Sequence, residues 1–260
     1  MAAIGDNCFD IYPKLKKSYP TGNAVDFAVH LQRLGVPTSL ISYTGNDLYG
    51  SKMIEAIRKE HIDISHLHVV EGPTALTCMD LSGTERIHGD YIEGVLENMK
   101  FSKEDIDFAG GHSLVHTAFW GKAEQDLEKL RSKGAKISFD YATKLDHPMV
   151  VTTLPFVDYA FFSYQESKES FDKEYLVEAV GKGPKIAVAT FGKEGSFAYD
   201  GKRFYEFGSF KARVVNTVGA GDAFIAGFIL GILMGRPIEK CLEKGAEIAA
   251  KVVEVFEAWD

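Results

Sequence analysis

The chain has 260 residues, 45% of them apolar and 25% charged, which is the composition of an ordinary globular protein with one substantial core. Its formal net charge is -8 and it has no long run of Lys or Arg, so the charge pattern argues against nucleic acid or an anionic membrane surface as a partner. A small molecule is the expected ligand.

The cysteines, Cys8, Cys78 and Cys241, are widely spaced and form no CxxC pair, so they suggest neither disulfides nor a zinc site. The first residues do not resemble a targeting signal, and the most apolar stretch, 223–234, is too short to span a bilayer. These features predict a cytoplasmic protein.

Along the chain, short runs of β-branched or aromatic residues alternate with segments of helical periodicity, a pattern typical of a parallel sheet covered by helices. The predicted strands are 38–43, 113–117, 136–140, 157–163 and 185–190, and the predicted helices are 23–34, 47–60, 123–132 and 173–181. Several helices are followed by glycine, as at Gly35 and Gly134, where a left-handed C-cap is expected. We expect a single domain over 1–260.

Two regions break this alternation and predict hairpins. Residues 74–81 and 86–91 read as paired strands joined by 82–84, and 196–208 reads as a hairpin that turns at Asp200-Gly201. The first hairpin fits either an edge of the main sheet or a lid over a site.

The segment 216–228 carries the strongest chemical signal, because small residues introduce a long apolar helix. Gly219, Ala220 and Gly221 let backbone N–H groups approach an anion, and the dipole of the following helix favours negative charge there. Asp222, in the first turn, is placed to accept a proton from an attacking hydroxyl. Alternatively, Asp222 only complements the helix dipole and the glycines only permit tight packing.

Segment 216–228 resembles the C-terminal signature of the PfkB carbohydrate kinases, the family of ribokinase, adenosine kinase and fructokinases. The resemblance implies that Asp222 is the catalytic base and that the amides of Gly219, Ala220 and Gly221 hold the transferring phosphoryl group. It also implies a ribokinase-like three-layer α/β/α sandwich with a mostly parallel central sheet. A small β lid is expected from about 12–20 and 73–93.

The family's nucleotide-binding motifs follow in the same order, which implies ATP and Mg²⁺ as cofactors. Thr190, Gly192 and Gly195 stand where the family has a Thr-x-Gly-x-x-Gly segment along the nucleotide. Ser163 and Glu166 occupy the ends of the Asn-x-x-Glu motif that organises magnesium and phosphates, with Ser in place of Asn. Glu166 is therefore the expected, indirect magnesium residue.

The sugar-binding residues are expected near the N-terminus. Residues 4–10 resemble the first strand of the family, whose final Asp holds sugar hydroxyls, so Asp10 is the candidate ligand; a solvated carboxylate is the alternative. Gly22, Asn23 and Asp26 lie where the family has Gly-Gly and a later Asn. Here Thr21 replaces one Gly and Asp26 replaces the Asn.

The resemblance covers nearly the whole chain and is closest to family members that phosphorylate a fructose joined through nitrogen to lysine. Segments 89–95 and 115–121 carry this resemblance, and the first of them implies that Asp90 and Glu93 lie on the lid. There the two carboxylates would face either the sugar or a cationic amine. The alternative is that they form a solvated rim. A homodimer through the lid is implied as well. The alternatives are a kinase for a free ketose or a nucleoside, and a kinase-derived sugar-binding protein.

Other motifs are set aside. Segment 45–52 has P-loop spacing but ends Ser-Lys, so its lysine is displaced from the phosphates. Gly219-Ala220-Gly221 begins like a dinucleotide fingerprint, but Phe224 occupies the third glycine position. His66 and His68 share one strand face and are interpreted as surface or packed residues rather than zinc ligands.

Overall fold

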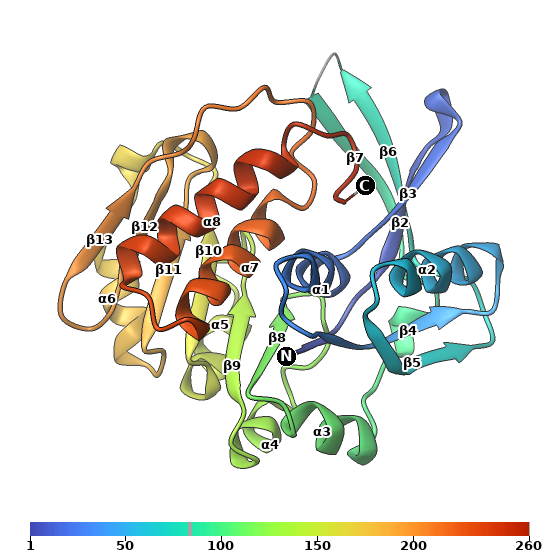
Figure 1. Ribbon diagram of the computed structural model, residues 1–260, viewed down its shortest axis with the longest axis horizontal. Helices are drawn as coiled ribbons and strands as arrows, with labels where there is room; N and C mark the ends of the chain where they lie inside the picture. Colours follow the sequence, from blue (N-terminus) through green and yellow to red (C-terminus); the bar gives the residue numbers. More distant parts are fainter. Residues whose placement is uncertain (83–84, 260) are drawn as a thin grey trace.

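The computed structural model describes residues 1–82 and 85–259 and contains a nine-stranded main sheet of order β13-β12-β11-β10-β9-β8-β1-β4-β5 (Figure 1). In this order, every strand from β11 to β5 is parallel to its neighbours in that stretch, whereas β12 and β13 form antiparallel pairs at the other edge. The strands are β1 Ala2–Ile4, β4 Ser39–Gly45, β5 Asp63–Val70, β8 Leu114–Ala118, β9 Lys136–Asp140, β10 Tyr159–Ser163, β11 Ile186–Thr190, β12 Ser196–Tyr199 and β13 Phe204–Phe207.

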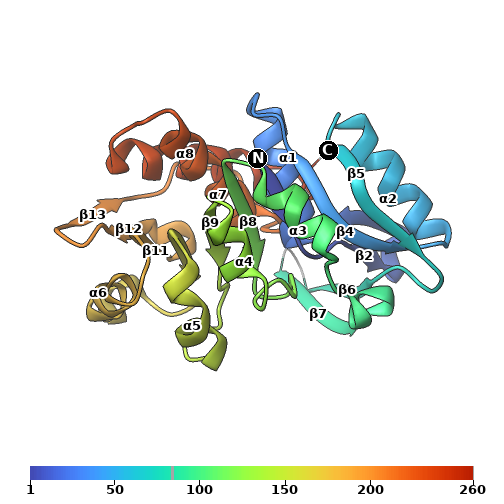
Figure 2. The ribbon, with the colours of Figure 1, turned by 90° about the horizontal axis from the view of Figure 1, so that it is seen from below.

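Helices cover both faces of this sheet (Figure 2). One face carries α1 Asn23–Arg33, α2 Leu48–Lys59, α7 Ala220–Leu233 and α8 Ile238–Val252, and the other carries α3 Lys103–Gly110, α4 Leu127–Ser132, α5 Pro148–Thr153 and α6 Glu174–Gly181. The expected α/β/α sandwich is confirmed. Within the described residues, no helix has both the length and the apolar character needed to cross a membrane.

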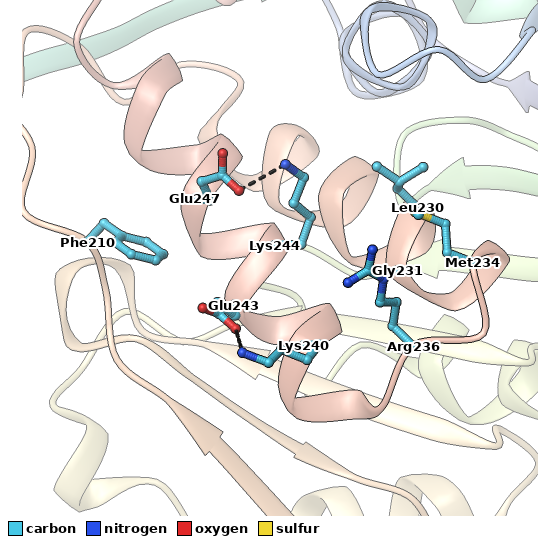
Figure 3. A pocket seen from close by; sticks show the side chains of 9 residues that line it. All are labelled: Phe210, Leu230, Gly231, Met234, Arg236, Lys240, Glu243, Lys244 and Glu247. Carbon is cyan, nitrogen blue, oxygen red and sulfur yellow. Dashed lines mark hydrogen bonds and ion pairs between the residues drawn. The ribbon is translucent and has the colours of Figure 1, made fainter.

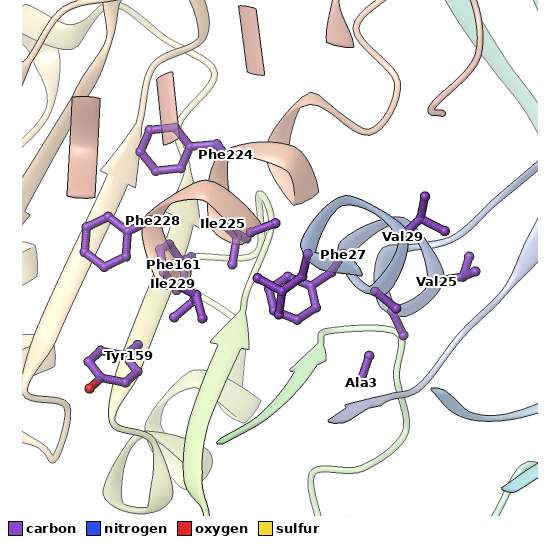
Figure 4. Packing of buried hydrophobic residues seen from close by; sticks show 14 of the residues in the cluster. Ala3, Val25, Phe27, Val29, Tyr159, Phe161, Phe224, Ile225, Phe228 and Ile229 are labelled. Atoms are coloured by element: carbon purple, nitrogen blue, oxygen red, sulfur yellow. The ribbon is translucent and has the colours of Figure 1, made fainter. Parts of the chain in front are cut away.

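The core beneath α1 and α7 fixes the relative position of the two helices that build the site. Phe27 from α1 and Ile225 and Phe228 from α7 are buried over the sheet, where Phe228 meets Phe161 of β10 at 5.4 Å between ring centroids (Figure 4). Each such side chain contributes roughly 1.5–3 kcal/mol through removal from water. The N-terminal turns of α1 and α7 are thereby held against each other.

A second, four-stranded sheet of order β3-β2-β6-β7 stands beside the main one (Figure 1). Its strands are β2 Cys8–Tyr12, β3 Lys17–Thr21, β6 Leu76–Ser82 and β7 Glu85–Ile92; β2 pairs with β6 in parallel, and the other pairs are antiparallel. The small sheet expected from the first hairpin is present. Gly83 and Thr84 of its predicted turn lie outside the described residues.

One expectation about the N-terminus is wrong: residues 4–10 do not form a single first strand. Strand β1 ends at Ile4, and β2 belongs to the small sheet, so Asp10 lies on the small sheet rather than at the end of a main-sheet strand. Gly5 makes the break possible, with a φ of 149° and a position where an added Cβ would lie 2.8 Å from Gly121 Cα. Only a residue without a side chain fits there.

The remaining element predictions agree closely with the structure. The five predicted main-sheet strands are found within two residues of their ends, and the hairpin at 196–208 is formed by β12 and β13. Gly35 and Gly134 have the expected positive φ. The helix predicted from 123 begins at Leu127, and α3, α5 and α8 have no counterpart among the predicted helices.

Candidate active site

The candidate site lies where the chain leaves β1 and where α1 and α7 begin. Gly22 is the N-cap of α1 and Gly219 the N-cap of α7, so the positive ends of two helix dipoles meet in one region. The carboxyl ends of parallel strands lie along the same edge, which is the usual ligand-binding edge of such sheets. Asn23 and Asp222 join the two helices directly through a side-chain hydrogen bond.

The start of α7 has the form of an anion site. Gly219 adopts the left-handed conformation with a φ of 68°, and its carbonyl accepts the Ala223 N–H at 2.8 Å. The Ala220 N–H donates to Thr217 at 3.3 Å, whereas the amides of Gly221 and Asp222, in the first turn, have no acceptor within the helix. An added Cβ at Gly221 would meet no protein atom within 4 Å, so space for a ligand lies beside these amides.

Asp222 is buried, with 6% of its surface exposed, and its Oδ1 accepts a hydrogen bond from Asn23 Nδ2 at 3.3 Å. Burial raises the pKa of Asp222 well above its usual range, and the negative charges of Asp26, Asp140 and Asp6 raise it further. The Asn23 hydrogen bond acts in the opposite direction. A carboxylate with such a raised pKa is a strong base for its type.

Asp6 and Asp140 also belong to this acidic cluster, although no sequence motif identified them. Asp6 accepts hydrogen bonds from the backbone amides of Asn23 at 3.0 Å and Ala24 at 3.4 Å, which anchors the start of α1. Burial raises the pKa of Asp140 to about 6, with a further contribution from Asp6. The available signal was positional, because Asp140 ends a strand and Asp6 follows one closely.

Asp26 is predicted to contact the sugar, but hydrogen bonds within the protein occupy its carboxylate and tie it to the C-terminal segment. Its Oδ2 accepts from Thr21 Oγ1 and its Oδ1 from Trp259 Nε1, both at 2.7 Å. Burial raises the pKa of Asp26 to about 8, although these two hydrogen bonds act in the opposite direction. Asp10 is also buried, on β2 between Tyr19 and Thr77 of the neighbouring strands.

The residues expected at the nucleotide gather at the carboxyl ends of β10 and β11. Ser163 and Thr190 are paired across these strands, with their hydroxyl oxygens 3.4 Å apart. Gly192 and Gly195 follow with φ of 53° and 95°. Glu166 lies exposed after β10, where its carboxylate accepts from the Tyr164 hydroxyl at 3.4 Å.

The two acidic residues expected on the lid differ in their surroundings. Asp90 is exposed on β7. Glu93, just beyond that strand, accepts from Lys122 Nζ at 2.6 Å, and Lys122 also donates to the Glu97 carbonyl at 3.0 Å. Lys122 follows the end of β8, so this ion pair joins the small sheet to the main sheet.

A separate groove of about 480 Å³ lies between the far end of α7, the helix α8 and Phe210 (Figure 3). Ion pairs between Lys240 and Glu243 and between Lys244 and Glu247 line it. Leu230, on its wall, is eight residues beyond Asp222, which is about 12 Å along the helix axis. This groove is therefore distinct from the candidate site.

His66 and His68 are packed residues that converge on one buried carboxylate. His66 Nδ1 and His68 Nε2 hydrogen-bond to Asp105 Oδ1 at 2.9 and 2.8 Å, and Ser102 donates to the other oxygen of Asp105. The three ligand atoms lie within 4.8 Å of one another, a spacing that would also admit a metal ion. Hydrogen bonding accounts for the cluster as it stands.

The P-loop-like segment has a structural role. Asp47 is the N-cap of α2 and accepts from the Gly50 amide, and its carboxylate also accepts from the Thr74 amide and hydroxyl. An added Cβ at Gly50 would lie 1.9 Å from the Gly45 carbonyl oxygen. The turn is filled by the protein itself, which leaves no room there for phosphates.

Comparison with known proteins places this site in a family. Residues 13–259 match the family described as "pfkB family carbohydrate kinase". The chain belongs to the PfkB family of carbohydrate kinases. Among PfkB relatives, it is 37% identical to fructoselysine 6-kinase of Escherichia coli, over all of this chain and 99% of that protein. It is 32% identical to fructosamine kinase FrlD of Bacillus subtilis, over all of this chain and 92% of that one.

Solved structures confirm the ribokinase-like fold of this PfkB chain. Arabidopsis thaliana ribokinase, complexed with ribose and ATP, superimposes with a TM-score of 0.86 at 20% identity, over 99% of this chain and 93% of that one. A putative ribokinase II from E. coli in complex with ATP and Mg²⁺ gives a TM-score of 0.84 at 20% identity, over the same shares. The chain is accordingly an ATP-dependent sugar kinase by family.

Proposed function

We propose that this kinase transfers the γ-phosphoryl group of ATP to a primary hydroxyl of a fructosamine such as fructoselysine. The observation that carries the proposal is the buried Asp222, whose pKa is raised and which lies in the same first turn of α7 as the amides that have no acceptor within the helix. The full-length similarity to fructoselysine 6-kinase and to a fructosamine kinase supports the choice of sugar.

In this mechanism Asp222 accepts the proton of the sugar hydroxyl while the hydroxyl oxygen attacks the γ-phosphorus of ATP. The bond between that phosphorus and the β–γ bridging oxygen breaks, and ADP leaves. Asn23 holds the carboxylate in place, and Asp10 and Gly22 would line the sugar side. Asp26, whose two oxygens are bonded to Thr21 and Trp259, supports the start of α1 instead of contacting the sugar. The amides of the turn at 219–222, of which those of Gly221 and Asp222 have no acceptor within the helix, stabilise the charge that develops on the transferring group.

The nucleotide would lie along the carboxyl ends of β10 and β11, beside Ser163, Thr190, Gly192 and Gly195. The exposed carboxylate of Glu166 is an oxygen donor of the kind that suits magnesium, held through water, so the residues present fit the ion. Magnesium, when bound, neutralises charge on the phosphates. Positioning and electrostatics then account for the rate.

The small sheet would act as a lid over the sugar and as the contact of a homodimer. Its edge strand β7 exposes Tyr91 and Ile92, at 43% and 49%, together with Asp90. An edge strand with exposed apolar side chains favours pairing with a second copy. Asp90, which is exposed, is the lid carboxylate proposed for the cationic nitrogen joined to the sugar.

A substrate panel tests the proposal. We expect kcat/KM, measured by ATP consumption, to be about 10-fold or more higher for fructoselysine than for fructose, because a charge-assisted contact contributes about 1.5–3 kcal/mol. Asp90→Asn should reduce this preference. Equal values for both sugars would contradict the fructosamine assignment, and binding of sugars without turnover would contradict catalysis.

The acidic cluster leads to a pH prediction. Asp140→Asn removes a negative charge that raises the pKa of Asp222, so the acid limb of kcat/KM should move to lower pH. The substitution keeps the oxygen that accepts from Ala142. Asp107→Asn, an equal charge change on the surface of α3, is the control, and an identical shift in both variants would contradict the local effect.

A further inference from the structure

The ion pair between Lys122 and Glu93 is anchored by a second contact of its lysine, as is the pair between Lys168 and Glu206, but it lies close to the start of α1. Lys122 donates to Glu93 Oε2 at 2.6 Å and to the Glu97 carbonyl at 3.0 Å. Its side chain is 31% exposed and that of Glu93 43%, so the pair is anchored yet open to solvent. Lys122 has a positive φ of 53°, which reflects the tight turn after Gly121.

This pair lies next to the candidate site. Gly121, beside Lys122, packs against Gly5, and Gly5 precedes Asp6 of the acidic cluster. Tyr91 of β7 lies near both groups: burial raises its pKa, and the charges of Cys8, Asp6 and Glu93 raise it further.

The pair has hydrogen-bonding capacity to spare. A lysine ammonium has three donors, of which two are used here, and an ionised carboxylate offers two oxygens, of which Oε2 receives Lys122. One cation and one anion thus stand side by side on a partly exposed surface. The ligand that complements both is a zwitterion, whose carboxylate meets Lys122 and whose ammonium meets Glu93.

We propose that Lys122 and Glu93 bind the free α-amino-acid end of the substrate, which makes the preferred substrate a fructosamine of an intact amino acid rather than of a simple amine. The inference rests on the proposed function. Trp120, 41% exposed and next but one to Lys122, offers an apolar surface for the methylene groups that join the two ends of such a substrate. Lys122 is a specificity residue that the sequence motifs did not identify.

The test compares fructoselysine with its decarboxylated analogue, the fructosamine of 1,5-diaminopentane, which keeps the sugar and both nitrogens. In the wild type we expect kcat/KM to be about 10-fold or more higher for fructoselysine. Lys122→Gln should bring this ratio close to one, and Lys122→Arg, which keeps the charge, should preserve it. Glu97→Gln is the matched control, because Glu97 contributes its backbone carbonyl to Lys122.

The outcomes distinguish failure of the proposed amino-acid site from failure of the proposed kinase function. Turnover of neither compound would contradict the fructosamine kinase itself. Turnover of both with a ratio near one in the wild type, or a ratio unchanged by Lys122→Gln, would overturn the amino-acid site alone. If Lys122→Gln fails to fold, Glu93→Gln tested on fructoselysine and its Nα-acetyl derivative decides, because the inference requires the preference for a free ammonium to fall.

Discussion

Asp222→Asn is expected to lower kcat by roughly 10²- to 10⁴-fold while leaving the KM for ATP nearly unchanged. The amide cannot accept the hydroxyl proton, and loss of a general base acts on the transition state rather than on nucleotide binding. Asn keeps an oxygen for the hydrogen bond from Asn23, so the geometry of α1 and α7 should survive. Steady-state kinetics with fructoselysine and ATP give both constants.

Thermal unfolding separates this catalytic effect from misfolding. Because the pKa of Asp222 is raised in the folded state, its contribution to stability is greatest at low pH and is lost as pH rises through the folded-state pKa. Asn does not titrate, so Asp222→Asn should be at least as stable as the wild type at alkaline pH. A folded variant within a few-fold of wild-type kcat would remove Asp222 from the role of base.

Gly221→Val is expected to abolish most turnover, by about 10²-fold or more, in a protein that still folds. An added Cβ at Gly221 meets no protein atom within 4 Å, and valine has a higher helix propensity than glycine. The stability cost should be small, whereas the side chain enters the space beside the first-turn amides of α7, where the phosphoryl group would lie. Loss of such a donor site costs about 10²–10³ in kcat.

Gly219→Val, two residues earlier, is the matched comparison, because we expect its main cost to be in stability rather than in turnover. Gly219 has a φ of 68°, and an added Cβ would lie 3.0 Å from the Ala258 Cβ, so valine there strains the backbone and crowds the C-terminal segment. We expect Gly219→Val to lose stability by about 1–3 kcal/mol, measured by denaturant unfolding. Full turnover by folded Gly221→Val would contradict the phosphoryl-binding role of this turn.

The contrast between these glycines shows what a local sequence motif predicts and what it does not. From the small residues at 219–221 the sequence predicted the helix start and a carboxylate in its first turn, and the structure confirms both. It did not distinguish the two glycines. Gly219 is needed for its backbone conformation and Gly221 for the space beside it, and the second property depends on what lies near the turn in three dimensions.

The sequence by itself determined the alternating strands and helices, the two hairpins and the chemistry at the start of α7, because each depends on neighbours along the chain. Tertiary structure decided which charges meet. Asp222 meets Asn23 across 199 residues and Trp259 meets Asp26 across 233, and no local pattern records such pairs. The pKa of Asp222 depends on burial and on carboxylates from three other segments. Coulombic interactions and desolvation act through space, so they become defined only when packing brings those segments together.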